Sequence, residues 1–296
     1  MFLTTLPDKN KFGPGPPGLP DLPENTVILA DTMDRYSYPV HTTPYLFVTH
    51  FFNKGQYLLN GRDITISPRQ FYFLNSNDTI GIDYPKSHLL RTCLILFKTG
   101  FVEDCLAYES ADKHKLLDSP DYRQPQDPAG FASLPFELTE EMGCILKLLA
   151  SCEDRDTLLF DLVMAAREQD GKTEKRIQRL SAIKRSTKEE LYHRLVKARE
   201  FMLDNIAQPL SIEQIAAEAC LDKFHFLASF KAVYNTTPHR WFIEQKLQKA
   251  LGLLQSGEHT VEEVCYLLGF QSPSSFSNLF KRRWQVPPGS KIPNFR

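Results

Sequence analysis

Two short stretches near the C-terminal end place basic, polar and apolar side chains at helical spacing on one side of the chain. The first set is Lys223, Phe224, Leu227, Ala228 and Lys231, and the second is Ser274, Ser277, Asn278, Lys281 and Arg282. In both stretches an i, i+4 pair of phenylalanines occupies the opposite side, and we expect each pair to face inward. Basic groups bind backbone phosphates, whereas small polar and apolar side chains contact base edges. The pattern therefore predicts two surfaces that bind double-stranded DNA.

These two sets belong to two copies of one sequence pattern. The copies run from Ser211 to Lys231 and from Thr260 to Lys281. Their offset is 49 before a central turn (Ser211 to Thr260) and 50 after it (Lys231 to Lys281). Because the one-residue difference is confined to the turn, we interpret the stretches as an internal repeat.

Each copy has the signals of two helices joined by a turn. Ser211 with Gln214, and Thr260 with Glu263, form capping boxes at the start of the first helices. Gly269 suits a left-handed helix end, and Asp222, Ser272 and Pro273 begin the second helices. A helix-turn-helix presents its second helix to the major groove. The alternative is a pair of helical hairpins in an all-α bundle that binds no nucleic acid.

Residues 187–296 resemble the AraC/XylS family of bacterial transcription regulators. The most specific stretch runs from Val264 to Arg282 and ends in Phe-Lys-Arg, and Ala250–Leu254 resembles the end of the helix that joins the two motifs in that family. The resemblance implies an all-α domain, here 188–296, whose recognition helices enter neighbouring major-groove segments about 34 Å apart. It also implies a cytoplasmic, nucleoid-associated bacterial protein that binds DNA, and RNA polymerase as a partner if the protein is an activator.

The resemblance is incomplete in the predicted recognition helices. The family usually has arginine where this chain has Ala228, and the matching position of the second copy is Asn278. The family's Gly-x-Thr-Pro ending appears here as Gln285–Pro288. With Phe224, Leu227 and Ala228 exposed, we expect the first helix to contact thymine methyl groups more than guanines.

Charge is unevenly distributed along the 296 residues. The chain has a net charge of −1, but residues 188–296 carry 14 Lys and Arg against 11 Asp and Glu, and the remaining residues carry 21 against 25. We therefore expect DNA affinity to depend on local clusters and on salt. One cluster is Lys281–Arg283, and the other is the basic run from Lys172 to Lys188, mostly within the predicted linker of residues 169–187. The latter is either a phosphate-binding segment or a flexible, solvated linker.

The N-terminal part predicts a β-rich domain. Residues 1–25 form a Pro- and Gly-rich arm, and from about Thr26 to Lys98 short apolar runs alternate with turns, including the hairpin signal Asn60-Gly61. Residues 26–168 are similar to the cupin-like sensor domain that often precedes AraC-type DNA-binding domains. The predicted fold class is thus α+β with two domains, a small N-terminal β-barrel with following helices and a C-terminal double helix-turn-helix domain. The helical stripe between Leu138 and Glu168 either pairs subunits or covers the barrel.

A ligand site in this domain is the least defined expectation. Phe47, Tyr57, Tyr72 and Phe73 could line a barrel mouth that holds an apolar or sugar-like effector, or they could be ordinary core. Metal-binding cupins use a His-x-His pattern, whereas His41, His50 and His88 stand apart, so we expect neither a metal nor another cofactor. The six cysteines include no C-x-x-C pair, and Cys220 and Cys265 fit as small hydrophobes.

The sequence as a whole predicts a ligand-responsive, sequence-specific transcription regulator that acts as an activator and a homodimer. No stretch approaches the ~18 apolar residues of a membrane span. Two rival hypotheses stay open. One is a DNA-binding protein whose N-terminal domain only dimerises, and the other is a metal-dependent cupin enzyme, for which no catalytic constellation stands out.

Overall fold

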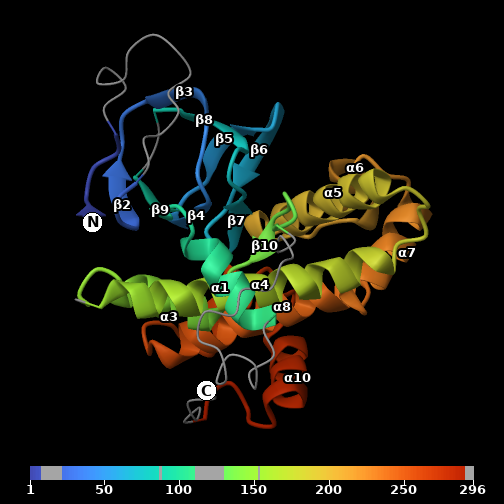
Figure 1. Cartoon of the computed structure of the whole chain (residues 1–296). Helices are drawn as coiled ribbons and strands as arrows, with labels where there is room; N and C mark the ends of the chain where they lie inside the picture. Colours follow the sequence, from blue (N-terminus) through green and yellow to red (C-terminus); the bar gives the residue numbers. More distant parts are fainter. Residues whose placement is uncertain (8–21, 87–88, 111–129, 153, 291–296) are drawn as a thin grey trace. The chain divides into compact units, whose positions relative to one another are not determined.

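The protein is described by a computed structural model that covers residues 1–7, 22–86, 89–110, 130–152 and 154–290 (Figure 1). The chain divides into two compact units, Met1–Glu174 and Lys175–Arg296. We call them the β unit and the helical unit.

Two sheets build the β unit. One has the strand order β1-β2-β9-β4-β7-β10 and the other β3-β8-β5-β6. The strands are β1 (Phe2–Leu3), β2 (Thr26–Thr32), β3 (Tyr36–Thr42), β4 (Leu46–Phe52), β5 (Gly55–Leu59), β6 (Arg62–Ile66), β7 (Gln70–Leu74), β8 (Thr79–Tyr84), β9 (Leu90–Leu96) and β10 (Phe136–Glu137). All neighbours are antiparallel except β1 and β2.

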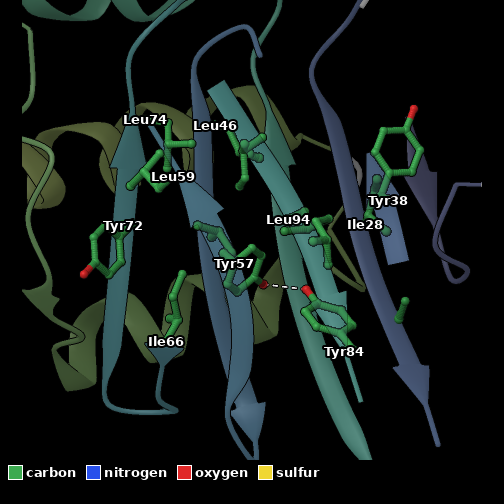
Figure 2. Close-up of a cluster of buried hydrophobic side chains, with 14 of the residues drawn as sticks. Ile28, Tyr38, Leu46, Tyr57, Leu59, Ile66, Tyr72, Leu74, Tyr84 and Leu94 are labelled. Carbon is green, nitrogen blue, oxygen red and sulfur yellow. Dashed lines mark hydrogen bonds between the residues drawn. The ribbon is translucent and has the colours of Figure 1, made fainter. Parts of the chain in front are cut away.

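The hydrophobic core of the β unit lies between these sheets (Figure 2). Tyr57 and Ile66 come from the four-stranded sheet, and Leu46 and Leu94 from the six-stranded one. Within the described residues no ladder joins an edge of one sheet to an edge of the other, so the expected barrel is not closed. The arrangement is a sandwich, which buries the same alternating apolar faces without ring closure.

Two further sequence expectations meet the structure in this unit. Asn60 and Gly61 have φ angles of 48° and 77°, which confirms the predicted two-residue hairpin between β5 and β6. The predicted arm of residues 1–25 differs, because Phe2 and Leu3 pair with Val27 and Ile28 as strand β1. Most of the Pro- and Gly-rich stretch, residues 8–21, lies outside the described residues.

An aromatic cluster occupies the other face of the six-stranded sheet. Phe47 stacks on Phe71, and Phe73 stacks on Phe97 and Phe131 with ring centroids 5.4 and 3.9 Å away. Helix α1 (Phe101–Ser110) follows, and its Phe101 stacks on Phe97. Helices α3 (Glu140–Leu148) and α4 (Arg155–Gln178) match the predicted helical stripe, which is interrupted between them.

The segment predicted as a basic linker is mostly helical. Helix α4 continues through Gln178, and α5 (Arg185–Asp204) begins seven residues later. Glu168 and Lys172 lie one helical turn apart on α4 and form an ion pair of 2.8 Å. This pair stabilises the part of α4 that continues into the predicted linker. Only residues 179–184 of the predicted linker separate the two helices.

The helical unit continues with five more helices. They are α6 (Ile212–Glu218), α7 (Lys223–Tyr234), α8 (Pro238–Gln255), α9 (Val261–Leu267) and α10 (Pro273–Trp284). The pairs α6–α7 and α9–α10 coincide with the two predicted copies, and α8 joins them (Figure 1). None of the helices in the described part of the chain is long and apolar enough to cross a membrane.

Candidate nucleic-acid interface

Both copies begin with the predicted capping boxes. Ser211 Oγ accepts the Gln214 backbone N–H at 3.2 Å, and the Gln214 side chain accepts the Ser211 N–H at 2.9 Å. Thr260 and Glu263 repeat these two bonds at 3.2 and 2.7 Å. The reciprocal bonds satisfy backbone donors that the first helical turn leaves free, and they fix where α6 and α9 start.

The turns of the two copies share one backbone conformation. Cys220 and Gly269 have φ angles of 51° and 67°, so the left-handed helix end predicted at Gly269 is confirmed. The next residues, Leu221 and Phe270, donate their N–H groups to Ala216 and Cys265 at 3.0 Å in both copies. Cys220 is exposed in this turn, which corrects the expectation that it packs as a small hydrophobe.

The second helices are capped at both ends. Asp222 accepts the N–H groups of Phe224 and His225 at 3.0 Å each, and the hydrogen bond from the His225 backbone lowers the pKa of that carboxyl. Ser272 caps α10, with Pro273 in its first turn as predicted. Helices α7 and α10 end at Asn235 and Gln285, which have left-handed φ angles of 54° and 61° and stand 50 positions apart. The repeat therefore extends to the ends of the helices.

The inner faces of α7 and α10 are equivalent as well. Phe226, Phe230, Phe276 and Phe280 are fully buried, which confirms the predicted orientation of both pairs. Their ring centroids are 5.5 Å apart in the first pair and 5.7 Å in the second. These rings determine which faces of the two helices point to solvent.

The predicted DNA-contacting residues occupy those outer faces. Lys223, Phe224, Ala228 and Lys231 of α7 are exposed, as are Ser274, Asn278, Lys281 and Arg282 of α10. Leu227 and Ser277 are half-buried. His225 and Ser275 are also exposed on these helices but were absent from the prediction, although their positions three residues before Ala228 and Asn278 signal the same face.

Charges on the two outer faces differ. The Lys223 ammonium lies 2.7 Å from the Glu213 carboxylate, and the Arg283 guanidinium 2.6 Å from Glu244. Within the described residues, Lys281 and Arg282 form no ion pair, and both lie in the last turn of α10. The second motif therefore offers more uncompensated positive charge than the first.

The residues predicted to line a ligand site are not brought together. Tyr57 and Tyr72 belong to the core between the sheets (Figure 2), whereas Phe47 and Phe73 join the aromatic cluster on the opposite face. Successive side chains of a strand point to opposite faces, so Tyr72 and Phe73 cannot line one wall. All four are buried.

The inter-sheet core contains a buried polar network instead. The His50 ring bonds to the Tyr57 hydroxyl at 2.9 Å through Nε2 and to the Thr92 hydroxyl at 3.1 Å through Nδ1. Tyr57 also bonds to the Tyr84 hydroxyl. Burial lowers the pKa of His50 to about 3 and raises the pKa of Tyr84 to about 12, so all these groups are neutral near pH 7.

The other two histidines that were considered as metal ligands, His41 and His88, are not part of the described network. The His41 Nδ1 lies 2.9 Å from the Pro39 carbonyl oxygen, and His88 lies outside the described residues. Across the part of the chain that the structure covers, no three His, Cys, Asp or Glu side chains gather as metal ligands.

Comparisons with known proteins agree with the geometry of the helical unit. Residues 215–291 match the family described as a helix-turn-helix domain. The probable transcriptional regulator LumQ of Photobacterium leiognathi is 20% identical over 266 residues, which cover 87% of this chain and 93% of LumQ. The MmsAB operon regulatory protein of Pseudomonas aeruginosa is 31% identical over 90 residues, which cover 30% of this chain and 29% of that protein.

Solved structures give two further similarities. A transcriptional regulator with an AraC-type DNA-binding domain from Chromobacterium violaceum is 27% identical over 32% of this chain and 85% of its own, with a TM-score of 0.31. ToxT of Vibrio cholerae is 15% identical over 90% of this chain and 94% of its own, with a TM-score of 0.34.

Two capped helix-turn-helix motifs joined by one helix define a DNA-binding transcription regulator. The similarity of the chain to AraC/XylS-family regulators, expected from its sequence, is supported by these comparisons. The relatives that it matches are themselves named as regulators rather than enzymes.

Proposed function

We propose that α7 and α10 enter two neighbouring major-groove segments on one face of a DNA duplex and contact it through the ten predicted residues. One observation carries this proposal: caps, turn, inner phenylalanines and helix ends recur at offsets of 49 and 50, and both copies leave a second helix exposed. A recognition helix has to be held by its inner face while its outer face is free. Both α7 and α10 meet that requirement.

The two helices contribute different contacts. Phe224 is 78% exposed, and together with Leu227 and Ala228 it gives α7 an apolar face suited to thymine methyl groups. Serine and asparagine on α10 suit hydrogen bonds to base edges, and Lys281 and Arg282 suit phosphates. In this proposal the first motif supplies mainly base contacts and the second supplies more of the salt-dependent affinity.

The β unit acts as the regulatory half of a homodimeric activator. A ligand bound to this unit alters DNA binding only if it has different affinities for two arrangements of the protein. The similarity to LumQ supports a regulator with both halves, because it extends over 87% of the chain. The activator in turn contacts RNA polymerase, and it acts in the bacterial cytoplasm at the nucleoid, where its DNA is.

A second candidate role for the β unit is dimerisation without any effector. The observation in its favour is the division of Phe47, Tyr57, Tyr72 and Phe73 between two faces of a sheet. Sedimentation of the full-length protein distinguishes the two roles when it is combined with DNA binding in the presence of metabolite pools. A dimer whose DNA affinity responds to no pool favours the dimerising role.

Selection from a pool of random duplex DNA by the full-length protein tests the proposed DNA recognition. We expect an enriched sequence with two half-sites whose centres are about 10 base pairs apart. The enriched duplex should bind at least about a thousandfold more tightly than unselected DNA at the same salt concentration. Equal affinity for the two would refute sequence-specific recognition.

A further inference from the structure

The turn of the second motif is in close contact with another part of the helical unit, unlike the turn of the first. A Cβ atom added to Gly269 would lie 2.0 Å from the carbonyl oxygen of Ala207, a distance that no side chain tolerates. Cys220 adopts nearly the same φ in the first motif, and its side chain is exposed. The left-handed turn alone therefore does not require glycine. Glycine is required at position 269 because the Ala207 carbonyl oxygen leaves no room for a Cβ atom.

Ala207 lies in the short connection that leads from α5 into the first motif. The connection is itself ordered by hydrogen bonds, since Asn205 donates its N–H to Phe201 at 3.1 Å and Gln208 donates to Asn205 at 2.9 Å. The contact between Gly269 and Ala207 thus joins the turn of the second motif to the entry of the first. It is a direct link between motifs that are separate in sequence.

A lysine of the joining helix contacts the next residue of the same turn. Lys246 of α8 is only 5% exposed, and its ammonium lies 5.5 Å from the centroid of the Phe270 ring and 4.8 Å from that of Phe242. A cation over aromatic faces is attracted most strongly where water is excluded. Burial also lowers the pKa of Lys246.

Phe270 carries this contact onward to the recognition helix. Its ring centroid is 5.0 Å from that of Phe276, one of the two inner phenylalanines of α10. The other end of α10 is held to α8 as well, because Arg283 pairs with Glu244. Helix α8 therefore contacts the second motif at its turn and at the end of its recognition helix.

We propose that the Gly269–Ala207 and Lys246–Phe270 contacts, which we call the inter-motif lock, set the distance between α7 and α10 and hence the half-site spacing that the protein accepts. The proposal rests on the proposed function and assigns positioning roles to Gly269 and Lys246. One base pair moves a half-site by about 3.4 Å along the duplex and rotates it by about a tenth of a turn. A rigid pair of helices cannot follow such a shift without losing contacts.

The test uses the full-length protein and the duplex that it selects, with one base pair added to or removed from the spacer between the half-sites. For the wild-type protein we expect each change to weaken binding at least about tenfold, comparable to the loss of one base contact. Gly269→Ala introduces the Cβ that meets Ala207, and Lys246→Met keeps the length of the side chain but removes its charge. Both variants should lose less than about threefold on the same spacer changes, because their second motif is free to shift.

Two matched variants serve as controls. Cys220→Ala changes the equivalent turn position of the first motif, where the side chain is exposed, and Lys249→Met removes an exposed lysine from the same helix as Lys246. Both should keep the wild-type spacing penalty. If Gly269→Ala does not fold, as judged by circular dichroism, Lys246→Met decides the test.

The possible outcomes separate the two proposals. Weaker binding by both lock variants with an unchanged spacing penalty would overturn the lock and leave DNA recognition intact. The lock would also be overturned if the wild-type protein bound its selected duplex with the same affinity at every spacer length. Failure to select any duplex would instead refute the proposed function, and the lock with it.

Discussion

The two helix-turn-helix motifs are nearly identical in backbone and different in outer surface. They share capping boxes, left-handed turns and buried phenylalanine pairs, yet α7 exposes Phe224 whereas α10 exposes serines, Asn278 and a basic last turn. Buried and capping positions are constrained by the fold, so the copies agree there. Exposed positions outside the caps are less constrained by the fold, so they can differ between the copies. Under the proposed function, we therefore expect the two motifs to contribute unequally to one DNA-binding event.

The largest expected effect is a loss of stability when a buried phenylalanine of α7 or α10 is removed, and it tests whether the inner faces of the two helices are equivalent. Phe226→Ala and Phe276→Ala should each lower the free energy of unfolding of the helical unit by about 3–5 kcal/mol, because each removes a fully buried ring. Both tryptophans of the chain, Trp241 and Trp284, lie in this unit, so urea unfolding followed by tryptophan fluorescence reports on it alone.

Phe224→Ala is the control for this pair. Its ring is 78% exposed, and we expect its removal to change stability by less than about 0.5 kcal/mol. If Phe226→Ala and Phe276→Ala differed by more than about 2 kcal/mol, the two motifs would not be energetically equivalent.

A second prediction concerns the charges that distinguish the motifs. Replacing both Lys281 and Arg282 by alanine should weaken DNA binding on the order of 50-fold at 0.1 M salt and reduce the slope of log K against log salt by about two. Lys223→Ala should cost less than about fivefold, because Glu213 already compensates that charge. Fluorescence anisotropy at several salt concentrations measures both quantities, with Lys249→Ala as a control. Equal slopes for the Lys223 and Lys281/Arg282 variants would contradict the asymmetry.

A third prediction tests the apolar face of α7. Substituting uracil for thymine in the half-site bound by the first motif removes the methyl groups and should weaken binding by about 1–2 kcal/mol. In the Phe224→Ala variant the same substitution should have a smaller effect, because the ring that contacts the methyl groups is gone. Unchanged wild-type affinity for the uracil duplex would remove the thymine-methyl hypothesis.

The smallest effect is expected at the capping boxes. Ser211→Ala and Thr260→Ala should each lower the stability of the helical unit by about 1 kcal/mol, since each removes the same side-chain acceptor from the start of a helix. Ser274→Ala, at an exposed position of α10 outside the cap, should be nearly neutral. A loss at only one box would show that the copies depend on their caps differently.

Local signals in the sequence predicted the two motifs of the helical unit. Capping residues, helical spacing and Gly269 act within a few residues of one another, so the starts, turns and inner faces of both motifs could be inferred directly. The contact of Gly269 with Ala207 joins residues more than sixty positions apart and has no local signature. The sequence also could not show that Lys246, a lysine in a charged helix, is buried.

The β unit was predicted less completely for a similar reason. Short alternating runs indicate strands, and Asn60-Gly61 fixed one hairpin, but whether two sheets close into a barrel depends on long-range pairing. The candidate ligand residues do not line one site, because they lie on two faces of a sheet. Tyr72 and Phe73 are neighbours on β7, and strand alternation alone places them on opposite faces.

The buried imidazole of His50 has a consequence for the protein in acid. In the unfolded chain this ring takes up a proton near its ordinary pKa of 6.5, whereas in the native β unit it does so only near pH 3. As the pH falls through this interval the unfolded state binds the extra proton, so the stability of the β unit declines. In the helical unit, the capping carboxylates Asp222 and Glu263 have lowered pKa values, so the stability that they contribute is lost only as the pH falls below their ordinary pKa values of 3.8 and 4.5. Mild acidification should therefore lower the stability of the β unit before that of the helical unit.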